Sequence, residues 1–226
     1  MDNKLYVVMA GLPARGKTTI AAKLRQNLSH DSVRTRIFNN GELRRKMIRE
    51  NTSYARFFDP QNKEGVALNH RIYRATTRDF KDYSRAELFL DPGFNVIDAT
   101  IVRDGARFLM FLKDETQRPE ARKDIRLAVA DHALGPYVVG PGPISKENWV
   151  EGPTAFRAGQ DMIVLFDAYT RKRYEGIRSR DLKTWAALDA GLEMPAGARH
   201  GTVLAVPEKI LKGLLAAAPP GSPTLE

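Results

Sequence analysis

The stretch "LYVVMAGLPARGKTT", from Leu5 to Thr19, joins a short apolar run to a glycine-rich loop. The apolar run predicts a β-strand, and the residues from Thr18 to Leu28 predict a helix. Gly11 to Thr18 satisfy the pattern G-x-x-x-x-G-K-[ST], in which backbone N–H groups and a helix N-terminus face phosphate oxygens. The sequence therefore predicts a nucleotide-phosphate site on a strand, loop and helix.

Similar strand and helix patterns alternate as far as about residue 115. Strands are predicted at 34–38 and 94–99, and helices at 42–50 and about 65–90. This alternation implies a parallel sheet covered by helices. The predicted fold of the first part is a partial α/β P-loop domain.

The residues expected to contact ATP and its Mg²⁺ ion belong mostly to the loop: Gly11, Pro13, Ala14, Arg15, Gly16, Lys17, Thr18 and Thr19. Lys17 would reach the β- and γ-phosphates, and the Thr18 hydroxyl would ligate Mg²⁺. Asp98, at the end of the strand predicted at 94–99, could join the Mg²⁺ shell or accept a proton from an attacking hydroxyl. The alternative for Asp98 is a carboxylate that caps a turn.

Two adjacent arginines follow the strand predicted at 34–38. Arg44 and Arg45 open a helix at the expected binding edge, where guanidinium groups could bind a sugar phosphate through paired hydrogen bonds. The alternative is a pair of solvated side chains.

Four motifs in order resemble the 6-phosphofructo-2-kinase family. The family's G-L-P-A-R-G-K-T is present unchanged at 11–18, F-N-x-G-x-Y-R-R corresponds to 38–45 with Leu43 in place of tyrosine, "FFDPQN" lies at 57–62, and D-A-T lies at 98–100. The resemblance covers about residues 4 to 112.

This resemblance implies a kinase that transfers a phosphoryl group from ATP·Mg²⁺ to fructose 6-phosphate. Lys17 and Asp98 would be the catalytic residues, Thr18 and Asp98 would hold the metal, and Arg44 and Arg45, with Arg71 from the following helix, would bind the substrate. The family's kinase domain continues beyond the point where the resemblance ends, so nucleotide binding is a firmer expectation than turnover. A nucleotide-binding fusion without activity is the alternative.

The pattern changes after the polar segment at 113–123. Short strand-like runs at 124–131, 153–158, 161–169 and 173–179 are joined by turn residues, which predicts an antiparallel all-β unit. We expect a P-loop domain at 1–118, a β-sheet segment at 119–210 and a C-terminal tail at 211–226.

Glu151 begins one of these strands beside Trp149 and Pro153. An apolar setting there would raise the pKa of the carboxyl and allow it to act as a general acid. The alternative is an ordinary loop glutamate.

Five runs of this second part resemble the last blades of five-bladed β-propeller glycosidases of the glycoside hydrolase family 43 type: "IRLAVADHALGPYV", "EGPTAFR", "MIVLFDAY", "SRDLKTW" and "ARHGTVL". The resemblance implies that Glu151 is the general acid, that His200 lines the central channel, and that Trp185 packs inward on an arabinan- or xylan-type hydrolase. No run before Glu120 resembles the earlier blades, which carry the remaining carboxylates, so hydrolysis is not expected.

The composition restricts the partners. The net charge is +9 and lies mostly in the first 118 residues, as expected for a protein that binds phosphorylated ligands; the alternative is a surface charge that serves solubility. The basic residues are dispersed, which argues against nucleic acid. No run near the N-terminus is long enough for a membrane span, and the chain has no cysteine, so we expect a cytoplasmic protein. Open blade edges would allow self-association.

Overall fold

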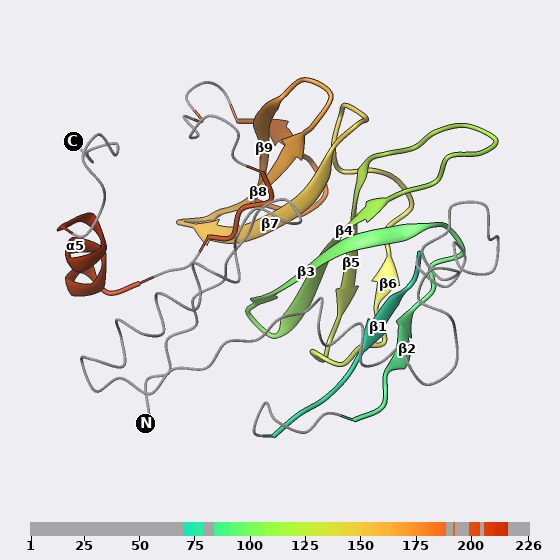
Figure 1. The fold of residues 1–226 in the computed structure, drawn as a ribbon, viewed down its shortest axis with the longest axis horizontal. Coiled ribbons are helices and arrows are strands. Elements are labelled where there is room, and N and C mark those ends of the chain that lie inside the picture. Colours follow the sequence, from blue (N-terminus) through green and yellow to red (C-terminus); the bar gives the residue numbers. More distant parts are fainter. Residues whose placement is uncertain (1–69, 79–83, 189–191, 193–198, 204–205, 217–226) are drawn as a thin grey trace.

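The structure is a computed structural model that describes residues 70–78, 84–188, 192, 199–203 and 206–216. The P-loop and both helices predicted at 18–28 and 42–50 lie outside the described residues. Within the described part the chain is built mainly from antiparallel sheets (Figure 1).

The first four-stranded sheet follows the chain order β3-β4-β5-β6 and is antiparallel throughout. Its strands are β3 (Val96–Asp104), β4 (Arg107–Asp114), β5 (Ile125–Ala130) and β6 (Val138–Val139). Asp104 pairs with Arg107, so β3 and β4 are joined by a two-residue loop in which Gly105 takes a φ of 61°. A glycine at positive φ is typical of such tight hairpins.

The second four-stranded sheet is also a simple antiparallel meander, in the order β7-β8-β9-β10. Its strands are β7 (Glu151–Ala158), β8 (Asp161–Ala168), β9 (Arg173–Ser179) and β10 (Ala186–Ala187). The strand runs predicted after residue 120 are therefore confirmed as β5, β7, β8 and β9. The first strands of the two sheets, β3 and β7, lie side by side.

Apolar side chains from both sheets form one buried cluster between them. Leu109 and Phe111 of β4 pack with Val164 and Phe166 of β8, and Trp185 packs against this cluster. The Phe111 and Trp185 rings meet edge to face with centroids 6.1 Å apart, so the predicted inward packing of Trp185 is confirmed. This core fixes the relative position of the two sheets.

A second cluster covers the other face of the first sheet. Alternate residues of β4, Met110 and Leu112, point there and pack with Leu90 and Val96. The covering element is a two-stranded sheet of β1 (Ile72–Arg74) and β2 (Glu87–Leu90), in which Ile72 pairs with Leu90.

The helix predicted at about 65–90 is wrong for the described part of that range. Residues 72–74 and 87–90 are strands, because pairing with each other and packing on Val96 bury apolar side chains that an isolated helix would leave exposed. The strand predicted at 94–99 does exist as the start of β3, but its partner β4 is antiparallel. No parallel strand pair occurs among the described residues.

The predicted boundary at residue 118 falls between β4 and β5, which are hydrogen-bonded neighbours. β3 and β4, which precede Glu120, form half of the first four-stranded sheet. The division into domains stays a prediction.

Helix α5 (Glu208–Ala216) follows the second sheet and includes the first six residues of the segment predicted as a tail. Among the described residues, no helix combines the length and apolar character that a membrane crossing requires.

Candidate functional site

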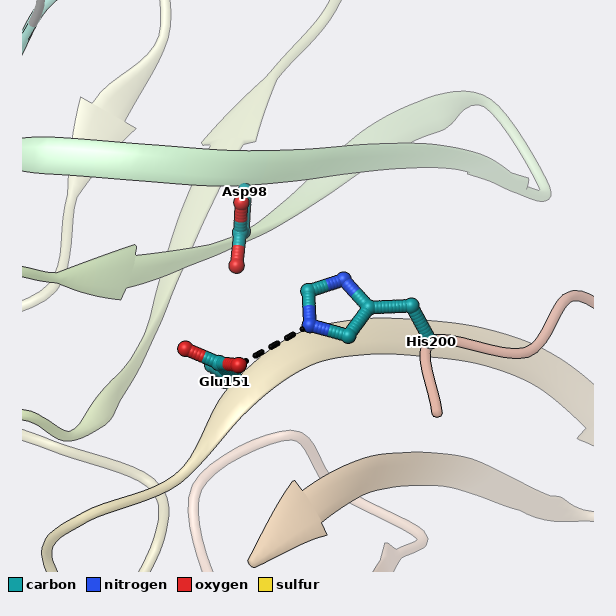
Figure 2. A group of neighbouring side chains, drawn as sticks. All are labelled: Asp98, Glu151 and His200. Atoms are coloured by element: carbon teal, nitrogen blue, oxygen red, sulfur yellow. Dashed lines mark hydrogen bonds and ion pairs between the residues drawn. The ribbon is translucent and has the colours of Figure 1, made fainter. Parts of the chain in front are cut away.

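Three side chains from distant parts of the sequence meet where β3 and β7 lie side by side. Asp98 comes from β3, Glu151 is the first residue of β7, and His200 lies beyond the second sheet (Figure 2). Each offers one ligand atom, and these atoms all lie within 4.8 Å of one another. The structure thus brings Asp98, predicted for a kinase site, to the two residues predicted for a glycosidase site.

Irregular backbone turns both carboxylates toward this point. The pairing of β3 with β4 shifts register between Ile97 and Thr100, and that of β7 with β8 shifts between Glu151 and Thr154. Asp98 lies in the first irregularity with a φ of 44°. Bulges of this kind re-aim side chains and are frequent beside active sites.

Gly152 links the two strands directly. Its backbone N–H donates to Oδ2 of Asp98 at 3.2 Å, and its φ is 57°. A Cβ at this position would lie 2.8 Å from Nδ1 of His200. Glycine is therefore required both by the backbone conformation and by the closeness of the imidazole ring.

Glu151 is surrounded by positive partners. Lys113 Nζ donates to its Oε2 at 3.1 Å, Arg199 donates to its Oε1, and His200 Nε2 lies 3.0 Å from the same Oε1. The hydrogen bond with His200, followed by the Lys113 ion pair, outweighs partial burial and lowers the pKa of Glu151 to about 2. The carboxylate is ionised at neutral pH.

The prediction that an apolar setting raises the pKa of Glu151 is therefore wrong. Trp149 and Pro153 are its neighbours in sequence, but the groups that reach its oxygens are cations. A carboxylate held in this state has no proton to donate to a leaving group at neutral pH.

Asp98 has the opposite tendency. Burial is the largest influence and raises its pKa, with the negative charge of Glu151 acting in the same direction. The positive charge of His200 and the Gly152 hydrogen bond compensate only in part. The pKa of His200 is itself raised, chiefly by its hydrogen bond with Glu151, which favours the imidazolium form.

A row of buried charged side chains, formed by Lys113, Glu115 and Lys123, adjoins Glu151. The Lys113 side chain is only 2% exposed and lies between Glu151 and Glu115, with its Nζ 2.7 Å from Oε2 of Glu115. Lys123 contacts the other oxygen of Glu115. Burial favours the neutral amine, but the hydrogen bonds to Glu115 and Glu151 outweigh it, and the pKa of Lys113 is raised.

Arg199 extends this row on the other side. It donates to Oδ2 of Asp167, a fully buried residue of β8, and to Oε1 of Glu151. Lys113 and Arg199 therefore fix Glu151 from two directions.

The three converging side chains offer oxygen and nitrogen ligands of the type that divalent cations accept. Both oxygens of Glu151 are already engaged by Lys113, Arg199 and His200. An ion or a polar ligand at this point would share the oxygens of Glu151 with their present partners.

Of the remaining predicted residues, the structure describes only Arg71. The ATP-contacting loop from Gly11 to Thr19, with Arg44 and Arg45, lies outside the described residues. Arg71 precedes β1 instead of lying in a helix, and its guanidinium contacts Asp91 at 2.5 Å and the His70 carbonyl at 3.0 Å.

Two residues of the site, Lys113 and Arg199, were not predicted from the sequence. Lys113 follows Leu109 and Phe111 on the same face of an apolar strand, and a charge in that position signals a buried partner. Arg199 adjoins His200, but its partner Glu151 lies 48 residues away, and no spacing rule connects them.

The described part thus belongs to the class of antiparallel β proteins, with a carboxylate and imidazole site between two sheets. A family model described as 6-phosphofructo-2-kinase matches residues 1–118, just over half of the chain. The chain belongs to the 6-phosphofructo-2-kinase family.

Similar curated proteins agree with this assignment. 6-phosphofructo-2-kinase/fructose-2,6-bisphosphatase 3 of Homo sapiens is 43% identical over 86 residues, which are 38% of this chain and 16% of the human protein. 6-phosphofructo-2-kinase 1 of Saccharomyces cerevisiae is 34% identical over 84 residues, covering 36% of this chain and 10% of the yeast protein. The chain therefore spans only a small fraction of the length of these relatives.

Solved structures that match part of the chain include two glycosidases. A GH32 β-fructofuranosidase of Bombyx mori has a TM-score of 0.41 and 16% identity, over 52% of this chain and 28% of the enzyme. An exo-β-1,3-galactanase from Phanerochaete chrysosporium, with galactose, has a TM-score of 0.32 and 13% identity, over 56% of this chain and 45% of the enzyme.

Proposed function

We propose that the N-terminal part of the chain binds ATP with Mg²⁺ and transfers a phosphoryl group to a sugar phosphate, with fructose 6-phosphate as the acceptor. The observation that carries this proposal is the complete G-L-P-A-R-G-K-T motif at 11–18 inside the region matched by the family model. Because ATP and sugar phosphates are cytoplasmic metabolites, we place the protein in the cytoplasm.

Each role in this proposal follows from phosphoryl-transfer chemistry. Lys17 neutralises the β- and γ-phosphates, Thr18 ligates Mg²⁺, and Arg44 with Arg45 positions the acceptor phosphate. Asp98 remains the proposed Mg²⁺ ligand or proton acceptor of the kinase site, and it also contacts Gly152 and lies beside Glu151.

Calorimetry with ATP·Mg²⁺ tests the binding step. Wild type should bind, and Lys17→Ala should weaken binding at least about tenfold, because the lysine charge on the phosphates is lost. Lys23→Ala, outside the motif, is the matched control. Failure of wild type to bind would refute the proposal. Transfer of labelled phosphate to fructose 6-phosphate would extend it to catalysis, and binding without transfer would limit it to a nucleotide-binding protein.

A second function is favoured by the site between the sheets, a carbohydrate-binding site formed by Asp98, Glu151 and His200. Glu151 and His200 are partly open to solvent, with side-chain exposures of 19% and 37%. Charged acceptors and donors fixed by buried partners suit the hydroxyl groups of a sugar. Since Glu151 is ionised, we propose binding and not hydrolysis.

Titration with xylohexaose and arabinohexaose tests this second function. Glu151→Gln should weaken binding of the better ligand, since the charge that accepts hydroxyl hydrogen bonds is lost. An unchanged affinity would place the ligand elsewhere. Release of nitrophenol from an aryl xyloside or arabinoside, abolished in Glu151→Gln, would instead show a hydrolase.

A further inference from the structure

Two aromatic side chains lie beside the carboxylate site, and the functions proposed above leave both unused. Trp149 comes two residues before Glu151 and is 45% exposed. Its ring meets that of Tyr169 edge to face, with centroids 6.4 Å apart. The chain has only one other tryptophan, Trp185, which packs against the core.

The backbone that carries Trp149 is firmly held. Arg171 donates to the carbonyl of Asn148 at 3.1 Å, and the N–H of Val150 donates to the carbonyl of Lys123 at 3.1 Å. Val150 itself is completely buried. The residues on both sides of Trp149 are therefore fixed, and the indole is displayed from a rigid segment.

Trp149 also has an unusual backbone conformation, with a φ of 63°. A bulky residue at positive φ is strained, and strain of this kind is frequent at functional sites. An exposed indole buries little surface in return. The fold alone gives no reason for a tryptophan here.

Tyr169 connects the exposed indole to the charged groups. Lys113 Nζ lies 4.9 Å from the centroid of the Tyr169 ring and donates to Glu151 at 3.1 Å. The aromatic pair and the ionised carboxylate are thus neighbours around one lysine. An aromatic face next to fixed polar groups is the usual composition of a small-ligand site.

We propose that Trp149, supported by Tyr169, is the stacking surface for one ring of a neutral oligosaccharide whose hydroxyl groups bind at Asp98, Glu151 and His200. A sugar ring has an apolar C–H face and polar edges, so it matches an indole beside carboxylates. The inference rests on the carbohydrate-binding function proposed above and adds the residue that contacts the apolar face.

Calorimetry with xylohexaose and arabinohexaose tests the stacking surface. Relative to wild type, Trp149→Ala should weaken binding of the better ligand about tenfold or more, the cost expected for a central aromatic contact. Trp149→Phe should restore most of the affinity, because an aromatic face remains. Trp185→Phe, in the core, should bind as wild type does.

Fluorescence provides a second measurement in the Trp185→Phe variant, whose only indole is Trp149. Saturation with the better oligosaccharide should shift its emission to shorter wavelength, since stacking removes water from the ring. If Trp185→Phe does not fold, wild type and Trp149→Phe give the same difference.

The outcomes separate the two proposals. If wild type binds and Trp149→Ala binds equally well, the stacking surface is refuted while the carbohydrate function stands. If wild type binds neither oligosaccharide and shows no spectral change, both are refuted.

Discussion

Strands β3 and β7 are counterparts in the two sheets, and each places an acidic residue at a local irregularity facing the other. Their surroundings differ. Asp98 on β3 is largely buried and accepts one hydrogen bond, from a backbone N–H. Glu151 on β7 instead contacts three side chains, those of Lys113, Arg199 and His200. Burial raises the pKa of Asp98, and the positive partners lower that of Glu151 to about 2. The surroundings of these two neighbouring carboxyls thus shift their pKa values in opposite directions.

The largest loss of stability should come from replacing Lys113, the lysine that forms an ion pair with Glu151. Lys113→Met leaves two partly buried carboxylates, Glu115 and Glu151, without a shared cation, and we expect a loss of about 3 kcal/mol in the free energy of unfolding. Urea denaturation measures it. Lys183→Met, at an exposed position, is the control and should stay within about 0.5 kcal/mol of wild type. A loss below about 1 kcal/mol for Lys113→Met would show that the row of charges contributes little.

The next effect concerns pH. Because the pKa of Glu151 falls from 4.5 to about 2 on folding, its ionised form stabilises the protein fully above pH 4.5, and this contribution is lost as the pH falls toward 2. It amounts to about 3 kcal/mol at neutral pH. Glu151→Gln should lower the unfolding free energy at pH 7 and flatten its decline in acid, as measured by denaturation at several pH values.

Asp98→Asn is the matched variant and should act in the opposite direction. Since folding raises the pKa of Asp98, its contribution falls as the pH rises through the folded-state pKa. The neutral amide should increase the unfolding free energy at pH 7 while its oxygen still accepts from Gly152. Effects of the same sign in both variants would contradict the contrast between the two carboxyls.

A smaller loss, about 1–2 kcal/mol, is expected for Gly152→Ala, because the new Cβ is strained at a φ of 57° and meets the His200 ring. Gly159→Ala is a close control, with a φ of 59° and no atom near its Cβ. NMR titration should show the raised pKa of His200 falling toward its ordinary value only in Gly152→Ala. An unchanged His200 titration would mean that the ring tolerates the methyl group.

The smallest effect lies at the other end of the same strand pair. Arg157 of β7 donates to Asp104 of β3 at 2.9 and 2.7 Å, but its side chain is 35% exposed. Arg157→Ala should cost about 0.2–1 kcal/mol, as for other exposed ion pairs. Thermal unfolding with Arg103→Ala as control measures this, and a larger loss would show that this end also holds the sheets together.

Most strands of the second sheet could be predicted from the sequence, because each is marked by a pattern within its own few residues and the adjoining turns. Alternating apolar runs and turn residues located β7, β8 and β9, and Glu151 with His200 emerged as candidates. The pairing of β3 with β4 in the first sheet could not be predicted, because "FNVIDAT" fits the end of a parallel strand as well as an antiparallel one. Only the pairing with residues 107–114 distinguishes them.

The chemistry of the site depended on contacts between distant residues. Lys113 and Arg199 lie 38 and 48 residues from Glu151, and they reversed the expected effect on its pKa. The apolar neighbours of Glu151 in sequence gave the wrong sign because the groups that contact its oxygens come from distant parts of the chain.

The position of β4 inside the fold has a practical consequence for choosing where to truncate the protein. Met110, Leu112 and Phe111 are fully buried on opposite faces of this strand, and its neighbour β5 begins at Ile125. A fragment ending at residue 118, where the family match stops, would lose β5 and expose these side chains with an open strand edge. Expression trials of the part matched by the family model should therefore extend at least through the second sheet, which shares a buried core with β4.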